Sequence, residues 1–462
     1  MKINLFFPLF LFAACFPLRA FALESANIQW DKKGEIRSRI YQDAVDNNAF
    51  EDKLVTDSMV LIKNNVWMLD HELLIKADVE GRLETFDNHD PSTDTSLRFK
   101  EDFLELTKGA QVFTFGEKIV TWGKLDDVVI LDKINPQDYR RFVLYDKQER
   151  KRSALMFKYD YNQEDWKVES VFKPFFKPSL VNFFGSDWAV FQNLKQAVAD
   201  SSVLSQAKKN IVSSIAIEDQ DNVTDNDLKN GEAGIRFASK MNDVDYSLYY
   251  MNVHNSIPVL KEKTATGNLV KKFLYIPNAD NLNALEAASP TGDDFILEKA
   301  HPRLNVIGAD WETVIGAFGI RGETGVLLGQ PFLRDDFSYV KKNLVSVGLG
   351  IDHTTSNDTY IDVQLIIDHV MDYERLFEQE ENSKRLTGSI RKSFKRGIVN
   401  FNLDWSYSLS YQDTMINPRI EYKFNNGVSV SFGGFIFMGD QTTTFGAFTT
   451  KDLIYTEIKY LF

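Results

Sequence analysis

The sequence predicts an all-β protein, a transmembrane antiparallel β-barrel of about 16 strands, within a range of roughly 14 to 18. Three observations support this fold class. Residues 453–462 alternate apolar and polar side chains over a length that suits a tilted strand crossing a bilayer. Similar alternating segments recur along the chain, joined in turn by tight turns and long loops. After residue 22, no run of apolar residues is long enough for a helical membrane span.

The first 22 residues are predicted to be a secretory signal peptide. Lys2 supplies its positive start, an apolar stretch follows, and the small-x-small motif at residues 20–22 predicts cleavage after Ala22. The alternative interpretation is a lipoprotein signal that ends at Cys15. Because Cys15 is the only cysteine, cleavage after Ala22 would leave a mature chain without disulfides or cysteine metal ligands.

The net charge is −13, and it becomes −15 when residues 1–22 with their two basic residues are removed. An acidic exported protein repels the phosphates of nucleic acid, so nucleic acid is excluded as a partner. An exported chain that stays in a membrane without helices must form a closed barrel, because every backbone polar group in lipid needs a partner. We therefore expect residues 23–462 to form a single barrel domain surrounded by outer-membrane lipid.

The first elements differ in clarity. Residues 35–44 could be a first strand, and residues 50–63 could be a strand, a short helix or a segment inside the barrel. Residues 73–86 alternate plainly. The further predicted strands are residues 97–106, 111–115, 154–161, 166–172, 231–240, 244–253, 304–314, 316–328, 344–353, 359–370, 385–392, 399–411, 420–424, 428–438 and 453–462.

Two of these later segments carry the sharpest signals. Residues 399–411 alternate apolar and polar side chains without a fault, which makes this the cleanest predicted strand. Asn425-Asn426-Gly427 predicts a tight hairpin turn between the two strands that flank it.

One face of residues 73–86 carries a row of charged side chains that cannot all lie in a dry core. A water-filled lumen would solvate them, and so would the exposed face of a soluble antiparallel sheet. The predicted lumen-lining charges are Lys76, Asp78, Glu80, Arg82, Glu84, Asp362, Asp368 and Asp404. Acidic residues outnumber basic ones among the inward positions, so an open lumen should favour cations.

Long loops are predicted at residues 173–230, 254–302, 329–343 and 371–384, and tight turns alternate with them. This asymmetry predicts long extracellular loops and short periplasmic turns. Residues 173–230 begin with a cluster of Phe and Trp, and residues 192–216 could form one or two amphipathic helices. Two interpretations stay open, a folded cap on the outer mouth or a gate whose apolar surface meets hydrophobic solutes or lipid.

The chain end places Ile458, Tyr460 and Phe462 on one face of the last strand. This ending resembles the closing strand of bacterial outer-membrane β-barrels. The resemblance implies that these three residues are an assembly signal read by the barrel-assembly machinery. We expect the same strand to close the barrel against the first strand.

Residues 115–142 resemble a broad group of uncharacterised Gram-negative outer-membrane barrels, which carry a Trp-Gly strand followed by Asn-Pro-x-Asp and a nearby arginine. The resemblance implies a segment folded into or across the lumen, and some such relatives are associated with export or uptake of hydrophobic compounds. The implied lumen or constriction residues are Trp122, Gly123, Asp126, Asp132, Asn135, Pro136, Asp138, Arg140 and Arg141. They could form ion pairs that shape the channel, or have a purely structural role.

Signals for an enzyme are weak. The six histidines are scattered, and no metal-binding, nucleophile-elbow or phosphate-loop motif occurs, so we predict neither catalytic residues nor a metal or cofactor. One alternative keeps an enzyme open. His353 and His369 could meet Asp352, Asp362 and Asp368 across one hairpin and form the site of an outer-membrane hydrolase.

The sequence thus predicts an outer-membrane protein of a Gram-negative bacterium, a porin-like channel or transporter for small or hydrophobic solutes. The alternative is a barrel that serves as the non-conducting outer component of an export or assembly system, and the hydrolase ranks third. A homo-oligomer or a periplasmic export partner is compatible with either of the first two functions.

Overall fold

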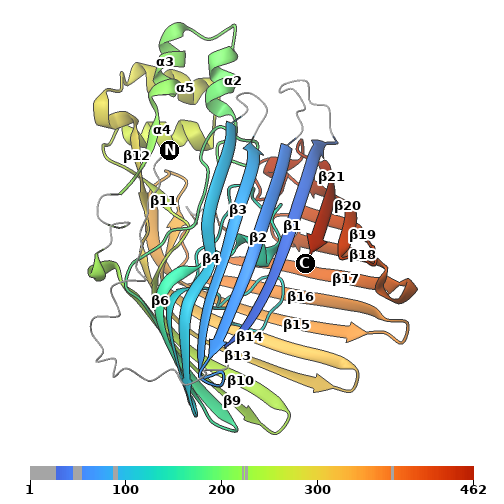
Figure 1. The fold of residues 1–462 in the computed structure, drawn as a ribbon. Coiled ribbons are helices and arrows are strands. Elements are labelled where there is room, and N and C mark those ends of the chain that lie inside the picture. The colour runs from blue at the N-terminus through green and yellow to red at the C-terminus, as the bar shows by residue number, and fades with distance from the viewer. Residues whose placement is uncertain (1–27, 45–54, 87–91, 221–222, 224–226, 376–378) are drawn as a thin grey trace.

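The computed structural model describes residues 28–44, 55–86, 92–220, 223, 227–375 and 379–462, so the predicted signal peptide lies outside the described residues. Eighteen strands form one closed antiparallel sheet (Figure 1). Each strand pairs with the next along the ring, and the last strand pairs with the first. The predicted fold class is therefore confirmed.

The barrel strands follow one another around the ring as β1 (Gln29–Asp43), β2 (Val55–Met68), β3 (Leu73–Phe86), β4 (Ser92–Lys108), β5 (Gln111–Lys118), β6 (Ala154–Asn162), β7 (Trp166–Lys173), β9 (Glu232–Met241), β10 (Val244–His254), β13 (Arg303–Ile315), β14 (Phe318–Leu333), β15 (Tyr339–Thr354), β16 (Thr359–Val370), β17 (Asn382–Phe394), β18 (Val399–Ser408), β19 (Thr414–Lys423), β20 (Val428–Met438) and β21 (Leu453–Leu461).

The count of 18 strands exceeds the predicted 16 by the two segments that the sequence left ambiguous. Residues 35–43 belong to β1, and residues 55–63 belong to β2, which is a strand and not a helix. The strand predicted at residues 399–411 is shorter in the structure. β18 stops at Ser408, and the chain then turns.

β21 and β1 close the barrel. Their register runs from Asp43 opposite Leu453 to Glu35 opposite Leu461. Beyond the strand end, Gly34 and Phe462 exchange two backbone hydrogen bonds of 2.7 and 3.0 Å. This pairing leaves no open sheet edge between the first and last strands, as a wall in lipid requires.

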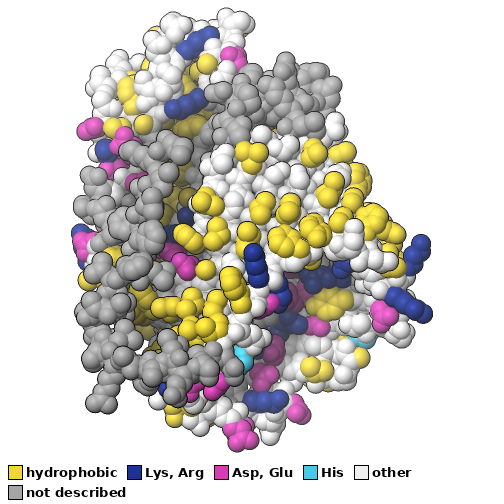
Figure 2. Space-filling view, viewed as in Figure 1, with side chains coloured by type: hydrophobic (Ala, Val, Ile, Leu, Met, Phe, Trp, Pro, Cys, Tyr) yellow, Lys and Arg dark blue, Asp and Glu magenta, His cyan; other side chains and the backbone are white. Residues whose placement is uncertain are grey.

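Side chains on the strands separate into an outer apolar face and an inner polar face. On β21, Ile454 and Ile458 are exposed outward, while Glu457 is buried inside. Figure 2 shows hydrophobic side chains spread over the outer face of the barrel, and basic and acidic side chains gathered in a hollow beside them. A bilayer would cover the first surface, and water or ion pairing must satisfy the second.

A β-bulge in β4 explains the impure alternation of that segment. Asp78 pairs with Glu101 and Val79 pairs with Phe99, so Lys100 is the extra residue. The bulge resets the alternation, and Phe99 is exposed outward whereas Phe103 is buried inside.

Tight turns follow β2, β4, β6, β9, β13, β15, β17 and β19 at one end of the barrel, where β1 begins and β21 ends. Long connections follow β5, β7, β10 and β20 at the opposite end. The prediction of a long loop at residues 329–343 is wrong. β14 continues past Gly329 to Leu333, with a register irregularity between Leu327 and Gln330, and β15 begins at Tyr339.

The connections after β7 and β10 fold together into a cap at one side of the barrel end (Figure 1). Two helices, α2 (Leu194–Asp200) and α3 (Gln206–Ser214), lie where the sequence predicted one or two. Residues 254–302 were predicted as a long loop without helices, yet they hold α4 (Gly267–Tyr275) and α5 (Ala279–Ala287), whose inner faces share one apolar cluster with α2 and α3.

The remaining elements are short. A three-stranded sheet in the cap is made of β8 (Ala216–Asp219), β11 (Val259–Glu262) and β12 (Ile296–Ala300). Single turns of 3₁₀ helix span Leu228–Asn230, Gly292–Phe295, Lys395–Gly397 and Gly446–Phe448. Helix α1 (Lys147–Arg150) lies in the connection after β5. Within the described residues, all helices are too short or too polar to cross a bilayer.

We predict that Gly34→Val weakens closure of the barrel. A Cβ atom at Gly34 would lie 2.2 Å from the Phe462 ring, so valine must displace the terminal residue. Heat-dependent gel mobility should show a lower unfolding temperature and less folded protein, as it should after deletion of Phe462. Gly81→Val is the matched control, because nothing lies within 4 Å of its added Cβ atom. Equal effects of the two valines would contradict the prediction.

Candidate functional site: a segment folded into the lumen

Residues 119–153 connect β5 to β6 and pass through the interior of the barrel. Trp122 is almost fully buried and packs against Tyr249 of β10, with ring centroids 5.6 Å apart. Leu131 lies so close to β13 that a Cβ atom on Gly308 would be 2.2 Å from its Cδ2 atom. Leu125 approaches Gly348 of β15 in the same way, at 2.3 Å. Small wall residues thus leave room for large side chains of the segment.

Glu323 on β14 anchors the middle of the segment. Its buried carboxyl group accepts hydrogen bonds from the backbone N–H groups of Lys124 and Leu125, both at 3.3 Å, and of Leu131. Gly123 has a φ of +100°, which favours glycine, and a Cβ atom there would lie 2.7 Å from Glu323 Oε1. The predicted Trp122-Gly123 pair therefore lies in a tight loop after β5 and is not part of a strand.

Asn135 ties the two ends of the segment together. Its side chain accepts from the N–H of Val120 at 2.8 Å and donates to the carbonyl groups of Lys118 and Arg152 at 2.9 Å. Pro136 contributes its carbonyl, which accepts from the Arg152 N–H at 2.9 Å. These bonds fix the points where the chain leaves and rejoins the wall.

Two further ion pairs brace the segment. The Asp132 carboxylate lies 2.6 Å from Lys151 within it. Asp126 reaches the wall instead, where it accepts from Arg321 of β14 at 2.6 Å.

Asp138, Arg140 and Arg141 form ion pairs with the wall of β3 and β4. Arg140 contacts Asp138 at 2.8 Å and Glu84 at 3.4 Å, and Arg141 contacts Glu84 at 3.3 Å. Arg98 of β4 lies 3.7 Å from Asp138. Burial raises the pKa of Asp138, but the hydrogen bond and charge of Arg140 outweigh it and hold that pKa below its usual value.

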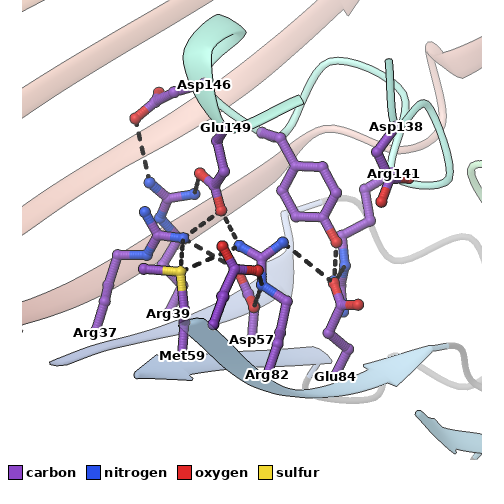
Figure 3. Close-up of polar contacts among 12 residues, drawn as sticks. Arg37, Arg39, Asp57, Met59, Arg82, Glu84, Asp138, Arg141, Asp146 and Glu149 are labelled. Carbon is purple, nitrogen blue, oxygen red and sulfur yellow. Dashed lines mark hydrogen bonds and ion pairs between the residues drawn. The ribbon is translucent and has the colours of Figure 1, made fainter. Parts of the chain in front are cut away.

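Glu149, on α1, is held by three arginines of the wall, Arg37 and Arg39 of β1 and Arg82 of β3 (Figure 3). Burial raises the pKa of the Glu149 carboxyl group, but these guanidinium groups outweigh it and hold the pKa well below its usual range. A depressed carboxyl pKa stabilises the docked segment above the ordinary glutamate value of about 4.3, and this stabilisation is lost only in stronger acid.

The predicted lumen-lining charges fall into two groups. Those of β3, from Lys76 to Glu84, are mostly buried in ion pairs, such as Arg98 with Glu80 at 2.6 Å. Of these, Arg82 and Glu84 contact the segment. Asp362, Asp368 and Asp404 lie on β16 and β18, and the segment meets this wall where the Asp127 N–H donates to Gln364 at 3.1 Å.

Part of the segment is exposed to water inside the barrel, on the side of β16 and β18. The side chains of Asp126, Lys147 and Asp146 are 42, 47 and 61% exposed. The segment therefore does not bury all of its charged groups against the barrel.

A second connection crosses the barrel mouth. Residues 174–193 start at β7 and reach the β20–β21 loop on the far side of the ring. There Asp187 pairs with Lys451 at 2.8 Å, Gln192 donates to the Ala447 carbonyl at 3.0 Å, and Trp188 stacks on Phe448. This strap joins an aromatic cluster that includes Phe142 of the inward segment.

The residues proposed for a hydrolase do not come together. His353 and His369 lie near opposite ends of the β15–β16 hairpin. In the strand register, His353 is opposite Ile361 and His369 is opposite Val345. Their bonding partners are the Ala317 carbonyl and Asn382. Within the part of the chain that the structure describes, no group of His, Cys, Asp and Glu side chains could hold a metal ion.

Sequence reasoning missed Glu149 and Glu323. Glu149 lies in a run of charged residues that is typical of a solvated turn, so no local signal marks it. Arg37 and Arg39 alternate with Ile36 and Ile40, and that period-two pattern could have placed them on the inner face.

The family described as "Protein of unknown function (DUF1302)" matches residues 93–460. Among solved structures, OccAB1 of Acinetobacter baumannii is similar with a TM-score of 0.53 and 7% identity, covering 94% of this chain and 96% of that chain. OpdL of Pseudomonas aeruginosa has a TM-score of 0.49 and 7% identity, covering 94% and 99%. No curated protein matches the sequence.

We predict that Glu323→Gln loosens residues 123–131. The amide can keep only part of the carboxyl group's acceptor role toward three backbone N–H groups, and a buried hydrogen bond contributes about 1 kcal/mol. Limited trypsin digestion in detergent should cleave after Lys124 or Lys133 several times faster than in the unmodified protein. Glu374→Gln removes a carboxylate that pairs with Arg334 at 2.7 Å outside the segment and serves as the control. Unchanged cleavage in Glu323→Gln would show that this residue does not anchor the segment.

Proposed function

Because the chain belongs to the DUF1302 family and is a closed β-barrel of the porin type, we propose that it is a channel or transporter for small or hydrophobic solutes. The protein lies in the outer membrane of a Gram-negative bacterium, since a closed barrel with an apolar outer face and a charged interior suits that membrane. Its terminal strand, with Ile458, Tyr460 and Phe462 exposed outward, is the proposed signal for the assembly machinery.

The inward segment is the observation that carries the proposal. Residues 119–153 reach from β13–β15 on one wall to β1–β3 on the other, so solutes must pass beside them. Charged side chains at Asp126, Asp146 and Lys147 meet water there. Exposed charges on a segment docked inside the barrel support selective passage more than free diffusion through a wide pore.

Aromatic residues support passage of hydrophobic solutes. Trp188, Phe437, Phe445 and Phe448 gather where the strap meets the β20–β21 loop, and Phe142 brings the inward segment to the same cluster. Phe437, Phe445 and Phe448 are buried in this cluster, so an apolar solute would meet the partly exposed rings of Trp188 and Phe142.

The second candidate is a non-conducting outer component of an export system with a periplasmic partner. The two crossings, at residues 119–153 and 174–193, favour it, because a lumen closed at two levels conducts nothing until a partner moves them. Conductance separates the two candidates.

We predict that the purified protein conducts in small discrete steps in planar bilayers. A variant with residues 124–131 replaced by a Gly-Ser linker of equal length should give steps several times larger. The linker lacks the side chains of Leu125 and Leu131 that pack on the wall. A closed trace for both proteins, with correct folding shown by heat-dependent gel mobility, would overturn the channel and favour the export component.

A preference for cations is a further prediction. Asp362 and Asp404 lie on the wall that faces the wet side of the segment. Asp362→Asn with Asp404→Asn should lower the cation-to-anion permeability ratio by about twofold, measured as a reversal potential in a salt gradient. Glu374→Gln, in the β16–β17 connection beside Arg334, should leave the ratio unchanged. An anionic reversal potential in the unmodified protein would refute the preference.

A further inference from the structure

Three buried arginines of the barrel wall converge on one point. Arg37 and Arg39 project from β1 and Arg82 projects from β3, and none of the three is more than 6% exposed. Figure 3 shows their guanidinium groups meeting the Glu149 carboxylate below the inward segment. Arg39 Nη1 donates to one carboxylate oxygen at 3.0 Å, and Arg37 and Arg82 both donate to the other. We call this set of three the arginine pocket.

The wall surrounds the arginine pocket with carboxylates that each reach only one or two of the three arginines. Asp57 lies 3.2 Å from Arg82 and 3.8 Å from Arg37, and Glu457 contacts Arg39 and lies 3.9 Å from Arg37. Glu35 lies 3.6 Å from Arg37, and Glu80 and Glu84 lie 3.8 and 4.0 Å from Arg82. Glu149, by contrast, contacts all three guanidinium groups, and it lies on a connection that is not part of the wall.

The helix that carries Glu149 is short and weakly capped. Helix α1 has four residues, and its N-cap residue Asp146 makes no side-chain cap bond. Asp146 and Lys147 beside it are 61 and 47% exposed, so water reaches one side of this turn. A solute in the lumen can approach the pocket from there.

We infer that the arginine pocket is a carboxylate-binding site of the barrel wall and that Glu149 occupies it as an internal ligand. A solute that carries a carboxylate group binds to the same arginines by displacing Glu149, and α1 moves aside. This inference rests on the proposed function, because the displaced turn borders the proposed solute path through the lumen.

Charge pairing explains why the solute must be a carboxylate. Withdrawal of Glu149 alone would remove a carboxylate to which all three buried guanidinium groups donate hydrogen bonds, which is unfavourable. A second carboxylate restores the paired state, since its two oxygens accept from arginine in the same planar geometry. A neutral molecule of the same shape cannot restore these ion pairs. We therefore expect carboxylates to displace Glu149, and we expect the segment to stay docked in the presence of other solutes.

Calorimetric titration of the purified full-length protein with benzoate tests the inference, with benzamide as the neutral analogue. Glu149→Gln removes the charge of the internal competitor, so benzoate should bind this variant at least tenfold more tightly than the unmodified protein. Benzamide should bind to neither. Glu374→Gln removes a carboxylate that Arg334 and Lys342 hold at 2.7 and 2.8 Å outside the pocket, and it should leave benzoate affinity unchanged. Equal benzoate affinity in Glu149→Gln and the unmodified protein would overturn the inference, and so would binding of benzamide.

A second measurement needs no variant that could fail to fold. Trypsin should cleave after Lys147 or Arg150 severalfold faster when benzoate is added to the unmodified protein, because displacement exposes α1. Benzamide should leave the rate unchanged. No acceleration by benzoate would overturn the inference. These readouts do not depend on ion flow, so a closed bilayer trace together with tight benzoate binding would contradict the channel and leave the site standing.

Discussion

Closure of the sheet between β1 and β21 is the constraint on which the rest of the structure depends. A wall in lipid cannot leave backbone N–H and carbonyl groups without partners, so the first and last strands must meet. Once they do, every strand has one face toward lipid and one toward a confined interior. The outer face then requires apolar side chains such as Ile454 and Ile458, and the inner face can hold charge.

The confined interior creates the second requirement, that inward charges be paired. β1 and β3 present arginines that pair with acids of the wall, and the connection after β5 adds Glu149, which bonds to Arg37, Arg39 and Arg82 together. On the opposite wall Glu323 accepts from the backbone of the same connection. Glu149 and Glu323 fix the segment to opposite walls, so the segment crosses the lumen. The interactions that stabilise the barrel interior therefore also narrow the lumen.

Much of the barrel could be predicted because alternation is a local property. In residues 399–408 each side chain's direction follows from the pleat of its own strand, so the outward and inward sets can be assigned without knowing the neighbouring strand. The bulge at Lys100 broke that period in β4, and only the pairing with β3 resolves it. The helices at residues 267–287 escaped prediction, because they bury their apolar sides against α2 and α3 from a distant part of the chain.

The sequence by itself determined that this protein is a closed barrel with an apolar outer face, because period-two alternation and the need to pair every backbone group admit no other membrane form. It also marked residues 115–142 as unlike the strands around them. Only the tertiary structure decided which charges meet. Arg39 and Glu149 are 110 residues apart, and Leu131 and Glu323 are 192 apart. A charged residue in a sequence carries no record of its partner, since ion pairing depends on distance in space and on burial, and both arise only when the barrel closes around the segment.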